Sequence, residues 1–176
     1  MEWLDELRAA AERLEGPTLL TLATLAKDGS PRARMLVVRN IESDGSLLAC
    51  SDLRSEKNMQ IALRSAAEAV LWFEKDRVQF RLRGHCELGD EDDVRQRVWS
   101  GMSDRARALF AWPQPKAERS SNDAFVEKVT ADNPMPANVE VLRLTPTVVD
   151  RLDLSPTPHR RTIWDPADGP PREVNP

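Results

Sequence analysis

The feature that most restricts the fold of this chain is a set of short apolar runs separated by Asp-Gly pairs. Lys27-Asp28-Gly29 and Ser43-Asp44-Gly45 each stand between two such runs. Asp-Gly favours the tight turns of β-hairpins, because glycine accepts the positive φ that these turns require. We therefore predict that the N-terminal half begins as an antiparallel meander.

The same alternation continues beyond the meander. In Arg77–Leu88, Val78, Phe80 and Leu82 alternate with polar residues, and Gly84 predicts a bend or bulge. The predicted strands are Thr18–Leu25, Arg32–Asn40, Ser46–Ser51, Ala67–Phe73, Arg77–Leu88, Val139–Leu144, Thr147–Leu152 and Arg160–Trp164.

Helical spacing of apolar residues occurs between these strands. Residues 1–15 are predicted to form an amphipathic cap helix, and Arg54–Ser65 a helix with Met59, Ile61 and Leu63 on its apolar face. Further helices are predicted at Asp90–Met102, Asp104–Trp112 and Asp123–Asp132. The proline-rich residues 156–176 are predicted to form an extended strap with little secondary structure. Helices follow only some of the strands, which indicates one α+β barrel domain over residues 1–176 instead of a parallel α/β sheet.

Composition narrows the classes of function. The 176 residues carry a formal net charge of −4, which argues against general binding to nucleic acid or to an anionic membrane. Any anion site must therefore be local. Cys50 and Cys86 match no metal-binding spacing and are interpreted as buried free thiols. With no signal peptide and no apolar run long enough to span a membrane, we expect a cytoplasmic protein.

Basic residues near one strand end could form such a local site. Arg34 and Arg39 bracket an apolar strand core, and a buried guanidinium requires an acceptor. Ser51–Lys57 then runs from a strand end into a helix start, where backbone N–H groups favour an anion. Ser51, Ser55 and Lys57 could complete a phosphate site, or Ser55 could simply cap the helix.

Other polar residues are less specific. Gln79, Arg81 and Arg83 share one strand face and could be solvated, although the amide of Gln79 could also bind a heterocycle. His85 and His159 have no partner at the spacing of a metal site or a catalytic triad.

Several motifs in order resemble the pyridoxamine 5'-phosphate oxidase family. They are Pro31–Arg39, Ser51–Lys57, Gln79–Gly84, Ala111–Pro115 and His159–Arg161 with Trp164, and they cover nearly the whole chain. The closer likeness is to the FMN-binding branch related to the oxidase. The resemblance implies a split β-barrel homodimer, with FMN (flavin mononucleotide) held in clefts between the two copies.

The resemblance also implies roles for single residues. Arg34 and Lys57 would contact the FMN phosphate, and Gln79 would bind the flavin ring. Gln114 and Arg161 would reach the cofactor from the partner chain. The implied cofactor-binding set is Arg34, Met35, Leu36, Val37, Arg39, Cys50, Ser51, Lys57, Gln79, Gln114 and Arg161.

Departures from the family pattern bear on the substrate. Glu56 stands where the family has a second phosphate-binding arginine, for which Arg54 or Arg32 could compensate. Arg39 replaces a lysine near the substrate. The positions aligned with the family's substrate-phosphate residues are Trp99, Ser103 and Arg107, and none keeps the family's residue.

The sequence thus predicts an FMN-dependent oxidoreductase acting on an unidentified small molecule. The alternatives are a true pyridoxamine or pyridoxine 5'-phosphate oxidase, a non-catalytic flavin carrier or sensor, and a barrel that binds haem or a deazaflavin. No acid or base residue stands out, and no metal site is predicted.

Overall fold

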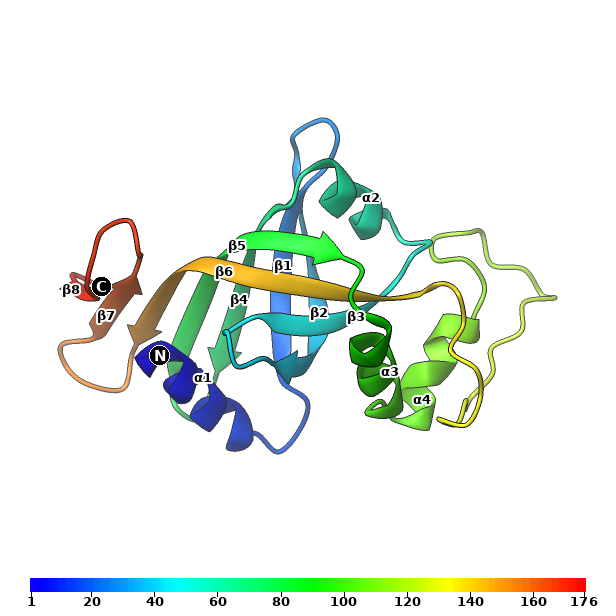
Figure 1. Ribbon diagram of the computed structural model, residues 1–176, viewed down its shortest axis with the longest axis horizontal. Coiled ribbons are helices and arrows are strands. Elements are labelled where there is room, and N and C mark those ends of the chain that lie inside the picture. Colours follow the sequence, from blue (N-terminus) through cyan, green and yellow to red (C-terminus); the bar gives the residue numbers. More distant parts are fainter.

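A computed structural model describes residues 1–176, and its centre is a closed antiparallel barrel (Figure 1). The sheet order is β3-β2-β1-β4-β5-β6-β7-β8, and an additional pairing of β3 with β6 closes the barrel. The strands are β1 (Leu19–Leu25), β2 (Pro31–Ile41), β3 (Leu47–Asp52), β4 (Ala66–Phe73), β5 (Val78–Leu88), β6 (Val139–Asp153), β7 (Arg160–Trp164) and β8 (Arg172–Val174). The predicted α+β split barrel with peripheral helices is confirmed.

Both predicted Asp-Gly turns are present. Gly29 and Gly45 have φ angles of 81° and 89°, a backbone conformation that residues with a Cβ atom rarely adopt. The preceding aspartates stabilise the turns, because Asp28 accepts a hydrogen bond from the backbone of Ser30 and Asp44 accepts one from Ser46.

The strand β6 is one continuous element where the sequence predicted two. Its first part pairs with β3 and its last part with β7, while β5 follows it along the other edge. The register of β5 and β6 shifts between Arg83 and Gly84, opposite Pro146, which confirms the predicted bulge. The bulge explains the continuity, because it lets Pro146 sit in the strand without breaking it.

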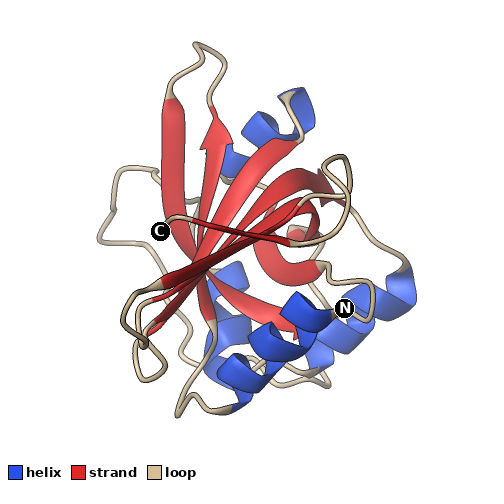
Figure 2. Ribbon diagram, turned by 90° about the vertical axis from the view of Figure 1, so that its left-hand side faces the viewer, coloured by secondary structure: helices blue, strands red, loops and turns tan.

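The helix α1 (Glu2–Glu12) covers one end of the barrel, as Figure 2 shows, and confirms the predicted cap. Its apolar face buries Trp3, Leu4, Leu7 and Ala10 in the main core. Within the barrel, Phe73 and Phe80 pack edge to face with ring centroids 5.9 Å apart. Alternate residues of the strands fill the rest of this core.

The helix α2 (Glu56–Leu63) is present, but its predicted apolar face is wrong. Met59 and Leu63 are 67% and 61% exposed, whereas the polar residues Asn58 and Gln60 are buried beside Ile61. These amides face the barrel because they bond to polar side chains of β1, β2 and β3. A hydrogen-bonded polar face thus replaces the usual apolar stripe.

The segment between β5 and β6 carries α3 (Asp92–Ser100), α4 (Asp104–Ala108) and a short 3₁₀ helix, Leu109–Ala111. The predicted helix at Asp123–Asp132 is wrong, because residues 112–138 form a looped arm that extends from the barrel (Figure 1). Within the arm, Asp123 and Asn133 accept hydrogen bonds from nearby backbone N–H groups, which favours turns over a helix.

The C-terminal strap is more ordered than predicted. β7 occurs where expected, but β8 pairs with it as a second strand through Arg161 and Val174. The resulting hairpin extends the sheet beyond the barrel, at the same end of the molecule as the N-terminus (Figure 1). None of the helices is long and apolar enough to cross a membrane.

Candidate functional site

The guanidinium of Arg34, on β2, is held by neutral acceptors only. It donates to the carbonyl of Leu22 at 3.1 Å, to Thr24 Oγ1 at 2.7 Å and to Gln60 Oε1 at 2.7 Å. Burial lowers the pKa of Arg34, although a guanidinium stays charged at neutral pH. Arg34 therefore carries a fixed positive charge with no carboxylate beside it.

Lys57, in the first turn of α2, adds a second unpaired cation. Its ammonium donates to Ser55 Oγ at 2.7 Å. Burial lowers the pKa of Lys57, and the nearby charge of Arg34 lowers it further. The one carboxylate that partly opposes this effect, Asp52, is itself paired with Arg54 at 2.6 Å. Arg34 and Lys57 therefore form a cationic pair that is ready for an anion.

The start of α2 is not closed by a capping side chain. Ser55 is the N-cap residue, but its hydroxyl donates to the carbonyl of Asp52 and caps no helix N–H group. Ser51 is also engaged internally, since it donates to Asn58 Oδ1 at 2.6 Å and so fastens α2 to β3. The capping alternative considered from the sequence is therefore not what Ser55 does.

A cavity of about 300 Å³, here called the β2 cavity, opens beside the predicted flavin-binding strand. β2 and β3 form one wall and the α4 segment forms the other. Its lining residues are Met35, Leu36, Val37, Arg39, Cys50, Asp52, Ala106, Leu109, Phe110 and Pro115. Most of these are apolar, as expected of a site for a ring system. The contribution of Ala106, Leu109 and Phe110 was not predicted, because nothing in their spacing separates them from core residues.

Arg39 and Asp52 are the charged residues in this mostly apolar lining, and Arg39 has the more unusual position. It lies at a β-bulge, since Val38 and Asn40 pair with adjacent residues of β3 and leave Arg39 as the extra residue. Its Nε is buried and has no hydrogen-bond partner. The structure thus presents an unsatisfied guanidinium donor at this cavity.

Cys50 lines the same cavity and stays a neutral thiol. Burial raises its pKa to about 11, although the positive charge of Arg39 acts in the opposite direction. Its sulfur lies 3.4 Å from the sulfur of Met102. Cys50 therefore contributes an apolar surface and offers no thiolate nucleophile at neutral pH.

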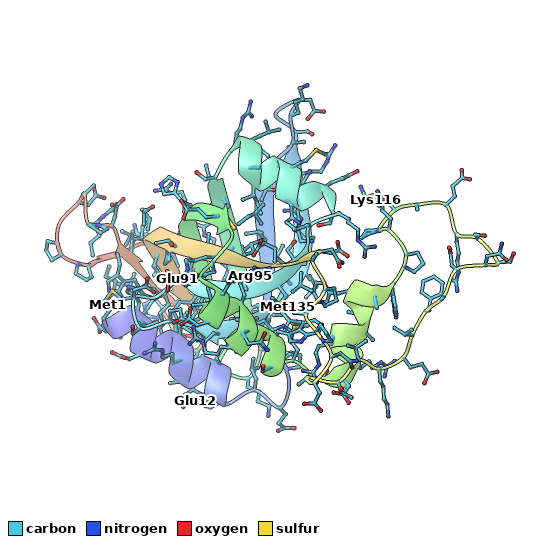
Figure 3. All side chains as sticks on the ribbon, turned by 45° about the vertical axis from the view of Figure 1, so that its right-hand side comes forward. Met1, Glu12, Glu91, Arg95, Lys116 and Met135 are labelled. Atoms are coloured by element: carbon cyan, nitrogen blue, oxygen red, sulfur yellow. The ribbon has the colours of Figure 1, made fainter.

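A second hollow of about 480 Å³, here called the α2 pocket, lies at the start of α2. Gln114, Pro115 and Lys116 of the arm form one side, and Pro115 also lines the β2 cavity. Lys116, labelled in Figure 3, forms a salt bridge with Glu56. Gln114 thus lies beside α2 of its own chain, and the contact with the partner's cofactor that the resemblance implies stays a prediction.

Glu56 is not compensated in the way suggested from the sequence. Arg54 is held by Asp52 and by the carbonyl of Trp112, so it does not face an anion site freely. Arg32 is exposed, and its guanidinium bonds only the carbonyl of Pro31. The positive charge available near α2 comes mainly from Arg34 and Lys57.

Gln79 and Arg161 lie elsewhere on the barrel. Gln79 is half-buried on β5, which is separated from β2 by β1 and β4. Arg161 bonds both oxygens of Asp150, at 3.0 and 2.6 Å, and Arg81 bonds the same carboxylate. One chain therefore does not bring these two residues to Arg34 and Lys57.

Comparison with known proteins decides the family. Residues 1–90 match the family described as "Pyridoxamine 5'-phosphate oxidase, FMN-binding domain". The pyridoxine/pyridoxamine 5'-phosphate oxidase of Ruegeria sp. (strain TM1040) is 31% identical over 174 residues, covering 93% of this chain and 83% of that protein. The chain belongs to this family.

Solved structures agree with the fold. A pyridoxamine 5'-phosphate oxidase-related, FMN-binding protein from Nostoc punctiforme PCC 73102 is 30% identical, with a TM-score of 0.87 over 100% of this chain and 98% of that one. PhzG from Burkholderia lata 383, in complex with tetrahydrophenazine-1-carboxylic acid, is 21% identical, with a TM-score of 0.83 over 99% and 91% of the two chains. At that identity, PhzG shows the shared fold alone.

The positions aligned with the family's substrate-phosphate residues have internal contacts here. Trp99 is fully buried, and Arg107 is only 4% exposed. Arg107 bonds backbone carbonyls, including that of Trp99 at 3.1 Å, while Ser103 accepts the capping hydrogen bond of α4. Trp99 and Arg107 therefore point into the segment that they stabilise, whereas Ser103 is exposed, and a substrate role for these three positions stays a prediction.

No group of three or more histidine, cysteine, aspartate or glutamate side chains is arranged to hold a metal ion.

Proposed function

We propose that this protein binds FMN between two copies of the chain and acts as an oxidoreductase on a small molecule. The observation that carries the proposal is the pair of cations, Arg34 and Lys57, with no acidic partner. A partly buried, uncompensated pair of this kind is costly unless an anion completes it. The terminal phosphate of FMN has the required charge, and the family's FMN-binding description supports this choice.

The residues present fit the rest of such a cofactor. Met35, Leu36, Val37 and Cys50 line the β2 cavity and offer a wall for the flavin ring. When bound, FMN would accept a hydride from a reduced substrate and pass two electrons to dioxygen or another acceptor. The protein would hold the phosphate with Arg34 and Lys57, exclude water with the α4 segment, and leave proton transfer to substrate or solvent.

A homodimer is supported by the exposed apolar residues around the two hollows. Met35, Leu53, Met59 and Leu109 are each more than 40% exposed, and they line the β2 cavity or the α2 pocket. Exposed apolar groups gathered at one place favour a protein partner. A second copy could also bring Gln79 or Arg161 to the site, which one chain does not.

A true pyridoxamine 5'-phosphate oxidase is less well supported. The α4 wall of the β2 cavity offers apolar side chains, and Arg107 is turned inward. Turnover of that substrate with release of peroxide would nevertheless establish it. A flavin carrier or sensor is favoured by the neutral state of Cys50, because a neutral thiol supplies neither a nucleophile nor a base to the cavity. Reduction of the bound flavin by small molecules under steady-state conditions separates an enzyme from a carrier.

The proposal is tested by FMN titration of the purified protein, followed by flavin fluorescence. Lys57→Met should weaken FMN binding about 10- to 150-fold, because a hydrogen bond to a charged group contributes about 1.5–3 kcal/mol. Lys27→Met is the matched control, since Lys27 is exposed and forms no ion pair. Riboflavin, which lacks the phosphate, should bind wild type and Lys57→Met equally.

Two results would contradict the proposal. One is wild-type protein that takes up no FMN across the titration. The other is Lys57→Met protein that binds FMN as tightly as the Lys27→Met control. Light scattering tests the shared site, because full flavin occupancy in a monomer is incompatible with it.

A further inference from the structure

The arm that leaves the barrel after Leu109–Ala111 contains a loop with a fixed neck. At the start of the arm, the carbonyl of Trp112 accepts a hydrogen bond from Arg54 at 3.0 Å. The indole of Trp112 then closes the neck, because its Nε1 donates to the carbonyl of Val126 at 2.8 Å and its ring packs edge to face on Phe125. The residues between these two points, 113–124, are here called the flap.

A single ion pair joins the flap to the barrel and its helices. Lys116, labelled in Figure 3, forms a salt bridge with Glu56 of α2, and no other hydrogen bond or ion pair links residues 113–124 to those elements. Both side chains are more than half exposed, so the pair is weak and easily broken. The backbone of Lys116 has a φ of 66°, a left-handed conformation that costs free energy for a residue with a Cβ atom. A weak contact thus holds the flap down against local backbone strain.

The flap borders both hollows that the proposed cofactor would occupy. Gln114, Pro115, Lys116 and Ala117 form one side of the α2 pocket, and Pro115 also lines the β2 cavity. The phosphate would lie near the start of α2 and the ring in the β2 cavity, so a ligand that reaches from one hollow to the other passes beside Pro115. Long loops without secondary structure often serve as lids over binding sites.

We propose that the flap opens to admit and release the cofactor, and that the pair of Glu56 and Lys116 is the latch that keeps the flap closed. The inference rests on the proposed function, because FMN is the ligand whose exchange the flap would control. A latch that forms in both the free and the loaded protein leaves the affinity unchanged, but it slows entry and exit by the same factor. For an exposed ion pair, this factor is about two- to fivefold.

The test measures the association and dissociation rate constants of FMN by stopped-flow flavin fluorescence. The double variant Glu56→Gln/Lys116→Gln removes the latch and leaves the net charge of the protein unchanged. Both rate constants should rise about two- to fivefold, while their ratio, the Kd, stays within about twofold of wild type. Glu15→Gln/Lys75→Gln is the matched control, because Glu15 and Lys75 form another exposed ion pair, which involves the turn between β4 and β5. The control should exchange FMN at the wild-type rates.

Trypsin cleavage after Arg119 measures the opening of the flap without any cofactor. Arg119 lies within the flap, and its guanidinium stacks over the ring of Phe125, 4.8 Å from the centroid. When opening is fast, the rate of cleavage follows the population of the open form. Glu56→Gln keeps every trypsin site and should be cut after Arg119 about two- to fivefold faster than wild type. Glu15→Gln is the control and should be cut at the wild-type rate.

The inference is overturned if the double variant exchanges FMN at the rates of its control, or if only its dissociation becomes faster. Faster dissociation alone would mean that the pair contacts FMN directly and does not act as a latch. Failure of the proposed function looks different, because the protein would then take up no FMN. In that case the trypsin experiment decides whether the latch exists, and equal cleavage of Glu56→Gln and Glu15→Gln overturns it.

Discussion

Gly84 allows a close approach of β5 and β6, and its substitution tests the described course of β6. A Cβ atom added at Gly84 would lie 2.0 Å from the carbonyl oxygen of Thr145 and 2.8 Å from Cα of Pro146. Both atoms belong to the backbone, so no side-chain rotation relieves the clash. Gly84→Ala therefore forces β5 and β6 apart at the bulge.

The magnitude follows from the size of that clash. Overpacking a well-packed interior costs about 1–3 kcal/mol and more where backbone must shift, while Gly→Ala stabilises by about 0.4–1 kcal/mol through the unfolded chain. We expect the free energy of unfolding to fall by about 3 kcal/mol, because the contact is about 1 Å shorter than Cβ atoms tolerate. For a domain of this length, that loss lowers Tm by about 6–12 °C.

Thermal unfolding followed by circular dichroism measures the effect. Gly16→Ala is the matched control, because a Cβ at Gly16 meets no atom within 4 Å, and its Tm should stay close to that of wild type. A Gly84→Ala protein that melts together with the control would refute the close approach of β5 and β6.

Three further predictions concern charged groups. Burial and the charge of Arg34 lower the pKa of Lys57, so FMN affinity should stay constant below that lowered pKa and fall as pH rises through it. The fall should begin below the ordinary pKa of lysine, and FMN titrations of wild type between about pH 7 and 10 should show it. A similar fall in Lys57→Met would contradict this prediction. Burial alone would raise the pKa of Asp150, but hydrogen bonds from Arg161 and Arg81 outweigh it and lower the pKa, so Asp150 stabilises the fold above the ordinary carboxyl pKa and loses this effect as pH falls through the lowered one. Asp150→Asn should therefore cost about 1–3 kcal/mol at neutral pH in urea unfolding, with the difference from wild type narrowing below about pH 4; a constant difference would argue against the charge. Glu56→Gln removes a negative charge beside the α2 pocket and should tighten FMN binding about two- to tenfold in low salt. Added salt should reduce this gain. If Glu56→Gln does not change FMN affinity, the phosphate does not bind near α2.

The barrel could be predicted from the sequence because its signals are local. Asp28-Gly29 and Asp44-Gly45 specify turns through their own backbone preferences, and the alternation around Phe80 specifies a strand face. The continuity of β6 could not be predicted in this way. In the sequence alone, Pro146 indicates a break between two strands. The strand continues because the register of β5 and β6 shifts next to Gly84, which lies opposite Pro146 but far from it in the sequence.

The site was predictable only in part, for a related reason. Arg34 and Lys57 stand out as basic residues at a strand and a helix start, but their lack of a carboxylate depends on Asp52 pairing with Arg54 instead. The burial of Gln60 could not be predicted, because sequence patterns assign polar residues to the solvent side of a helix. The helix predicted at Asp123–Asp132 does not form, because its apolar residues Phe125 and Val126 are exposed and bury no amphipathic face.

Because Arg34 and Lys57 repel each other, the stability of the fold would depend on how much of the proposed FMN ligand the cell supplies. A dianion bound between them would supply the missing counter-charge, and a ligand present at a hundred times its Kd stabilises a fold by about 2.7 kcal/mol. A cell short of riboflavin would then hold a larger unfolded fraction of this protein, exposed to its proteases. Vitamin supply would in this way set how many copies survive, before any question of catalysis arises.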